Sequence, residues 1–138
     1  MRRLMTVLAA AIVLPLTACG DDSNPTEEAA AVSGTYTLRT INGEDLPVTI
    51  DQVGDDFAEV IHGSVTFHAD NLFTDSVTFR YTIEGEVTVE EDAISGTYEQ
   101  NGSAVVLTPS DDSGTYSMSV SGNTLTQTFA QFALVYSK

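Results

Sequence analysis

The chain has 138 residues, of which 20 are acidic and five are basic, giving a formal net charge of −15 at pH 7. Nucleic-acid binding needs basic patches that neutralise phosphates, so this charge argues against nucleic acid as a partner. The length suits one domain, and a single cysteine, Cys19, leaves no internal disulfide to support its core.

Residues 1–18 have the architecture of a secretory signal. Arg2 and Arg3 are followed by an apolar run over residues 4–16, which is shorter than the roughly 20 residues of a membrane span. The run closes in Leu16-Thr17-Ala18-Cys19, which resembles the lipobox of bacterial lipoproteins. The resemblance implies cleavage before Cys19 and a diacylglyceryl thioether on its sulfur, usually with a further acyl chain, such as palmitate, on the new amino group.

Lipidation of Cys19 predicts where the protein resides. Two or three acyl chains hold a protein stably at a membrane, where one chain is marginal. The next residue is Gly20, whereas Asp at this position favours inner-membrane retention in enterobacterial lipoproteins. The interpretation is a protein of the bacterial cell envelope, anchored to the outer membrane on its periplasmic or surface face. The alternative is an ordinary secreted protein whose leader contains a cysteine.

Residues 19–32 are expected to form a disordered tether between the lipid and the domain. They are mainly Asp, Ser, Asn, Pro, Glu and Ala and have no apolar period. From Ser33 onward apolar and polar residues alternate, which is typical of half-buried antiparallel strands. The domain is therefore expected over residues 33–138.

Turn pairs such as Asn42-Gly43 and Asn101-Gly102 separate the alternating runs and supply the positive-φ residues that tight hairpins need. Eight or nine short strands joined mostly as hairpins predict an all-β fold, either an antiparallel up-and-down barrel of about eight strands or a meander sandwich. A barrel also removes the free edges that invite edge pairing. The expected strands are residues 35–41, 46–50, 60–69, 72–83, 86–90 with 93–100, 103–108, 114–121, 124–129 and 131–137.

Two features depart from the simple alternation. Residues 50–61 carry Val53, Phe57 and Ile61 four apart, which makes them the best helical candidate, although Gly54 weakens a helix and an irregular turn is the alternative. The tetrapeptide Ser-Gly-Thr-Tyr occurs at residues 33, 95 and 113. The spacing is irregular, so we expect each Gly to end a turn and each Thr-Tyr to begin a strand.

Gly34-Thr35-Tyr36 resembles the Gly-x-Trp start of lipocalins and other calycins, with Tyr36 in place of the Trp. Residues 42–47, Asn-Gly-Glu-Asp-Leu-Pro, are similar to a turn of small bacterial lipocalin-like lipoproteins. The resemblance implies a lipocalin-like β-barrel and a tendency to bind apolar small molecules. The flanking C-terminal helix of lipocalins has no room here, because the strand pattern runs to Lys138.

Catalytic and metal-binding chemistry find little support, so we expect no enzyme, no metal and no cofactor. His62 and His68 are metal-ligand types, but residues six apart on a strand lie about 20 Å from each other. Surface histidines are the simpler interpretation. The acidic groups 55–56, 90–92 and 111–112 fall at expected turns, where calcium sites are conceivable and solvated turns are the default.

The inward-facing residues define the functional prediction. A barrel of eight strands can be filled by side chains or can hold one small ligand. A non-enzymatic protein that binds a small apolar ligand is the first interpretation, and an envelope protein with a filled barrel that contacts another protein is the second. Residues expected to contact a ligand are Tyr36, Phe67, Phe79, Tyr81 and Tyr116.

Overall fold

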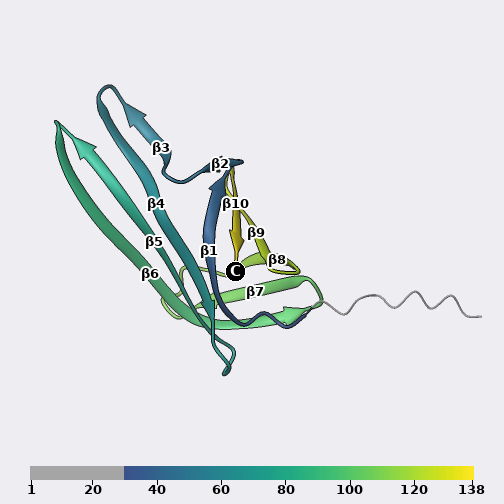
Figure 1. The fold of residues 1–138 in the computed structure, drawn as a ribbon. Coiled ribbons are helices and arrows are strands. Elements are labelled where there is room, and N and C mark those ends of the chain that lie inside the picture. Colours follow the sequence, from purple (N-terminus) through teal and green to yellow (C-terminus); the bar gives the residue numbers. More distant parts are fainter. Residues whose placement is uncertain (1–29) are drawn as a thin grey trace, which may run out of the picture.

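The structure is a computed structural model that describes residues 30–138, so the leader and Cys19 lie outside the described residues. The described part is all-β, as the alternation predicts (Figure 1). No helix in residues 30–138 has the length and apolar character needed to cross a membrane. The strands are β1 (Gly34–Ile41), β2 (Glu44–Asp45), β3 (Val48–Val53), β4 (Asp56–Phe67), β5 (Leu72–Ile83), β6 (Glu86–Asn101), β7 (Ala104–Pro109), β8 (Tyr116–Ser121), β9 (Thr124–Phe129) and β10 (Phe132–Ser137).

Eight of these strands close into an antiparallel barrel. From β4 to β10 each strand pairs with the next in the chain, β10 pairs with β1, and β1 pairs with β4 to complete the ring. The short strands β2 and β3 are additional and pair with β1 and β4 respectively. The predicted up-and-down barrel of about eight strands is therefore confirmed.

The ring is closed along only part of its height. β1 pairs with β4 through Gly34–Thr37 and residues 64–67, and farther along β1 turns to β2 while residues 56–60 of β4 pair with β3. We call the first region the closed end and the second the open end. At the open end β3 and the neighbouring parts of β4, β5 and β6 form a splayed sheet that leans away from β1 and β10 (Figure 1). The barrel wall is thus split between β1 and β4.

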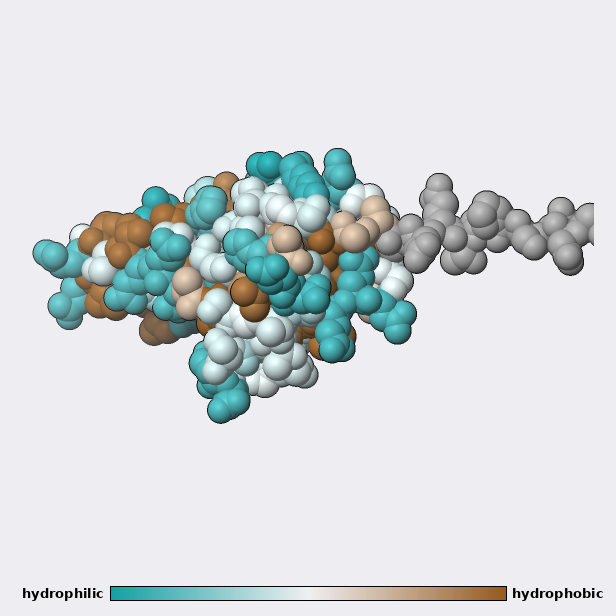
Figure 2. All heavy atoms as spheres, turned by 90° about the horizontal axis from the view of Figure 1, so that it is seen from below, coloured by the Kyte–Doolittle hydropathy of each residue, from teal (hydrophilic) through white to brown (hydrophobic). Residues whose placement is uncertain are grey.

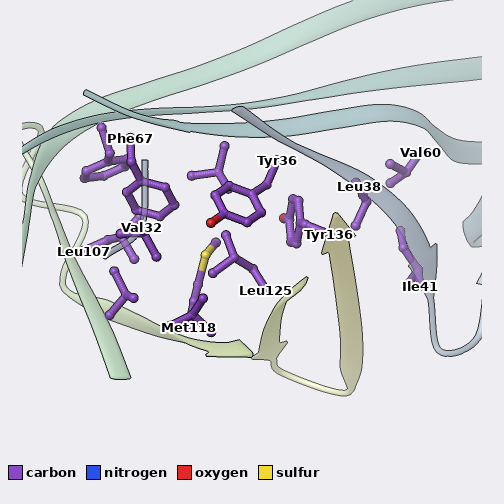
Figure 3. Packing of buried hydrophobic residues seen from close by; sticks show 14 of the residues in the cluster. Val32, Tyr36, Leu38, Ile41, Val60, Phe67, Leu107, Met118, Leu125 and Tyr136 are labelled. Atoms are coloured by element: carbon purple, nitrogen blue, oxygen red, sulfur yellow. The ribbon is translucent and has the colours of Figure 1, made fainter. Parts of the chain in front are cut away.

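Side chains fill the closed end. The side chains of Val65, Val105, Leu107 and Leu125 have no exposed surface. They share one core cluster with Tyr36, whose ring packs edge-on against Phe67 at 5.9 Å between centroids (Figure 3). This packing also includes residues before β1. Val32 is buried, and its N–H donates a hydrogen bond of 2.8 Å to Gln100 Oε1.

Gly96 lies where β6 passes from the splayed sheet into the closed end. Its partners are Phe73 on β5 and Pro109 on β7. A Cβ here would clash with the carbonyl oxygen of Thr108 and would lie 2.9 Å from the Phe73 ring. The expectation that every Gly of the Ser-Gly-Thr-Tyr repeats ends a turn is wrong for this copy, because close strand approach, not a turn, requires the glycine.

The helical interpretation of residues 50–61 is also wrong, since these residues form β3, a turn and the first part of β4. Val53 ends β3 and Phe57 lies near the start of β4, so a hairpin turn separates these two residues. The strand pairing also skips Ile50 in β3 and Ile61 in β4, and each bulge shifts the alternation by one residue. The spacing of four between Val53, Phe57 and Ile61 therefore spans a turn and a bulge and is not a helical period.

A turn was expected around residues 91–92, and this expectation is wrong. β6 runs without a break for 16 residues and pairs with β5 from Glu86 to Thr97. Glu and Asp are depleted in strands, which is why the run Glu90-Glu91-Asp92 favours a turn on sequence grounds. Here these residues are exposed, and charges on an exposed edge strand protect it from pairing with other chains.

Candidate ligand-binding cavity

A cavity of about 540 Å³ lies at the open end, between the splayed sheet and strands β9 and β10. Ligand sites of small molecules commonly have volumes of roughly 300–1,000 Å³ and mainly apolar walls. Ten of the lining residues are Leu, Ile, Val or Phe. The lining consists of Leu38, Ile41, Ile50, Val60, Asp75, Val77, Phe79, Ile94, Ser113, Gly114, Thr115, Tyr116, Gln127, Phe129, Phe132, Leu134 and Tyr136.

The cavity follows from the split in the barrel wall. Val60 pairs with Phe79, and Gly63 pairs with Val77, so the inner face of the splayed sheet continues the apolar face of the closed end. At the closed end buried side chains fill the interior, whereas at the open end the splayed sheet leans away from β1 and β10 (Figure 1). The inner faces of β5 and β10 therefore border a space that their side chains do not fill.

One charged residue lies among these apolar walls. Asp75 occupies an inward position of β5, where Val65 and Ile94 are its neighbours on the adjacent strands. Its side chain is buried, with 8% of the residue exposed. The Tyr116 hydroxyl donates a hydrogen bond of 2.8 Å to Asp75 Oδ2, and Oδ1 has no hydrogen-bond partner. A buried polar atom without a partner is costly, commonly about 1–3 kcal/mol, and requires an explanation.

Burial governs the ionisation of this cluster. Burial raises the pKa of Asp75, and the hydrogen bond from Tyr116 partly opposes the rise. The pKa of Tyr116 is also raised, first by burial and then by the nearby Asp75 charge. The same two causes raise the pKa of Tyr136. Both tyrosines therefore stay neutral, and the hydroxyl proton of Tyr116 is already donated to Asp75.

The structure divides the five residues expected to contact a ligand. Phe79 and Tyr116 line the cavity. Tyr36 and Phe67 belong to the packed closed end, where each is 2% exposed. Tyr81 lies beyond the cavity lining on β5 and stacks on Phe79, with 6.0 Å between the ring centroids. The two alternatives for the interior, filled and hollow, thus each describe one end of the same barrel.

Asp75 is the residue that sequence reasoning missed. The signal was present, because residues 73, 75, 77 and 79 share one face of a strand and Asp75 is the charged member of an otherwise apolar series. A carboxylate at such a position must find a partner or bear the cost of burial. Its partner, Tyr116, lies 41 residues away, so no local pattern could connect the two.

The other candidate sites stay apart from the cavity. His62 and His68 do not line it, and His68 Nε2 lies 3.4 Å from the Thr74 hydroxyl on the neighbouring strand. Within residues 30–138 no group of three or more His, Cys, Asp or Glu side chains is arranged to hold a metal ion. Asp111 accepts a hydrogen bond from the backbone N–H of Ser113, as in a capped turn.

No family model, curated protein or solved structure matches the chain. The fold and the cavity therefore define the class: a small antiparallel barrel with one filled end and one hollow end.

Proposed function

We propose that this chain is a lipid-anchored lipoprotein of the bacterial cell envelope that binds a small apolar ligand at the open end of its barrel, without enzymatic activity. One observation carries the binding proposal, namely the cavity of about 540 Å³ with apolar walls. The walls come from β1, β3, β4, β5, β6, β8, β9 and β10 and from residues 113–115, so most of them are held by paired strands. The lipobox-like residues 16–19 support the anchor.

Binding is tested with N-phenylnaphthylamine, a neutral dye whose fluorescence rises in apolar surroundings. The protein carries Cys19→Ala, so that no attached acyl chain competes for the cavity. We expect saturable fluorescence that decreases when Val77→Phe fills the cavity. The matched control is Val106→Phe, which enlarges an exposed valine on β7. Absence of saturable binding by the folded protein, or equal binding by both variants, contradicts the proposal.

The anchor is tested separately by fractionating bacterial cells that express the full chain. Cys19→Ala removes the thiol that would be acylated, so the protein is expected to leave the membrane fraction. Ser23→Ala serves as a control that changes a nearby residue and keeps the cysteine. Membrane association that persists in Cys19→Ala overturns the anchor.

A second candidate function, contact with another envelope protein, is favoured by the outer face of the splayed sheet. Val87 and Val89 of β6 are 62% and 57% exposed and lie on the face opposite Phe79. In Figure 2, brown, apolar surface gathers at the left of the picture, on the side of the splayed sheet. Replacement of both valines by Thr is expected to weaken such a contact in cross-linking of intact cells and to leave dye binding unchanged.

A further inference from the structure

The polar groups of the cavity are arranged asymmetrically. Apart from two tyrosines, Asp75 is the only ionisable residue among the described residues that line the cavity. The Tyr116 hydroxyl donates to only one of the two carboxylate oxygens of Asp75. Oδ1 is left without a partner and is itself buried, at a site where burial already disfavours the charge, so a ligand reaches it when the Asp75 side chain turns toward the cavity. A ligand that donates a hydrogen bond to this carboxylate would remove the deficit, and a cationic donor would also neutralise the charge.

Further carboxylates flank the cavity on the same face. In the register of β5 with β6, Asp92 lies opposite Val77 and Glu90 lies opposite Phe79. Directly opposed residues of an antiparallel pair project on one side of the sheet, with Cβ atoms about 5 Å apart. Two apolar residues of the cavity wall therefore each have an acidic neighbour, and the approach to the cavity is negatively charged.

The described basic residues are all engaged elsewhere. Arg80 pairs with Glu59 on the outer face of the splayed sheet. Arg39 Nε donates to Ser137 Oγ at 2.9 Å, and Lys138 Nζ lies 4.9 Å from the centre of the Tyr36 ring. None of the three lines the cavity, so an anionic ligand would meet carboxylates with no cation to offset them.

We infer that the cavity selects amphipathic cations, with the apolar body of the ligand against Phe79 and Leu134 and a protonated amine donating to Asp75. This inference rests on the proposed binding function and adds the chemical class of the ligand. The carboxylates of Glu90 and Asp92 beside the cavity attract such ligands. They repel fatty acids, whose own carboxylates would lie beside Asp75, Glu90 and Asp92. The tyrosine hydroxyl holds Asp75 in place by its bond to Oδ2.

The test is competition for N-phenylnaphthylamine by octylamine, octanol and octanoate at neutral pH. The three probes share one apolar chain and differ in the head group, and the protein again carries Cys19→Ala. We expect octylamine to displace the dye about tenfold more effectively than octanol, as one charge-assisted hydrogen bond would give, and octanoate to be weakest. Octanol or octanoate equal to or better than octylamine overturns the inference.

A substitution tests whether the preference for octylamine arises at the Asp75 carboxylate. Asp75→Asn keeps the shape of the side chain and an acceptor for the Tyr116 hydroxyl but removes the charge. The advantage of octylamine over octanol should fall to about twofold or less, while the dye still binds. Asp70→Asn is the matched control, because it makes the same change of charge at an exposed turn. An advantage that survives in Asp75→Asn, or is lost equally in Asp70→Asn, overturns the inference.

These outcomes separate the two proposals. If the dye does not bind the folded protein, the binding function itself fails. If the dye binds and Val77→Phe blocks it, but the three head groups compete equally, the cavity is an apolar site without selectivity for cations. The comparison of head groups uses the unmodified cavity, so it remains decisive even where a substitution of Asp75 impairs folding.

Discussion

The two ends of this barrel use the same strands for different purposes. At the closed end β1 pairs with β4, and side chains such as Leu107 and Leu125 have no exposed surface. At the open end the same two strands pair with β2 and β3 instead, and Phe79 and Leu134 line a cavity and are half-buried. The difference shows that a small barrel can combine a packed core with a cavity. The loss of pairing between β1 and β4 along part of their length is sufficient for both to form.

The division also shows where stability is concentrated. Burial of apolar surface is the dominant favourable term in folding, and the closed end contains most of the completely buried side chains. The splayed sheet has strands that are paired on both sides only in its middle, with β3 and residues 86–95 of β6 at its edges. We therefore expect the free energy of unfolding to depend mainly on the closed end, and ligand binding mainly on the open end.

The largest expected effect comes from two matched leucine substitutions. Leu107→Ala empties a completely buried site at the closed end and should lower the free energy of unfolding by about 2–5 kcal/mol. Leu134→Ala enlarges a cavity that already exists and should cost about 1 kcal/mol, because fewer of its contacts are lost. Urea denaturation monitored by circular dichroism measures both. Equal losses, or a larger loss for Leu134→Ala, would break the distinction between the two ends.

Gly96→Ala addresses the point where β6 passes between the two ends. The added methyl would clash with the Thr108 carbonyl oxygen and crowd the Phe73 ring, so strand β7 or the ring must shift. Overpacking of this kind commonly costs about 1–3 kcal/mol. Ser95→Ala, one residue earlier at an exposed position, should change stability by less than about 0.5 kcal/mol. A thermal melt of Gly96→Ala that matches the unsubstituted protein would show that the close approach is not required.

The closed end was largely predictable from the sequence, and the open end was not. Alternation of apolar and polar residues placed Tyr36, Leu107 and Tyr136 on the inner face, where the structure has them buried. Alternation is a local property, so it reports faithfully on regular paired strands. The bulges that skip Ile50 and Ile61 interrupt it, and these bulges lie in the strands of the splayed sheet.

Closure of the barrel is also beyond local patterns. β4 pairs with β3 in a local hairpin and with β1 across about 30 residues of sequence, and the chain uses both pairings at different heights. The cavity exists because of this change of partner. For the same reason, the sequence indicated an aromatic inner face but could not tell that Phe67 is packed while Phe79 borders open space.

The smallest expected effect is the change in the free energy of unfolding that results from burying the Asp75 carboxylate. Because its pKa is raised in the folded state, the folded protein holds the Asp75 proton more tightly than the unfolded chain, and the associated stability is lost as pH rises through the folded-state pKa. Asp75→Asn removes this loss. At neutral pH the variant should be more stable by about 1 kcal/mol, and the advantage should disappear below the ordinary Asp pKa of 3.8, where both states are protonated.

Thermal melts of Asp75→Asn, Asp70→Asn and the unsubstituted protein across acid and neutral pH measure this effect without any ligand. Asp70→Asn shows what the loss of one exposed negative charge does in a chain of net charge −15. A gain confined to Asp75→Asn indicates a carboxylate kept at the open end at the expense of stability, which is the usual relation between a binding site and its fold. A loss of stability at neutral pH would instead make the Asp75–Tyr116 hydrogen bond a structural link between β5 and β8, and the open end would then share the role of the closed end.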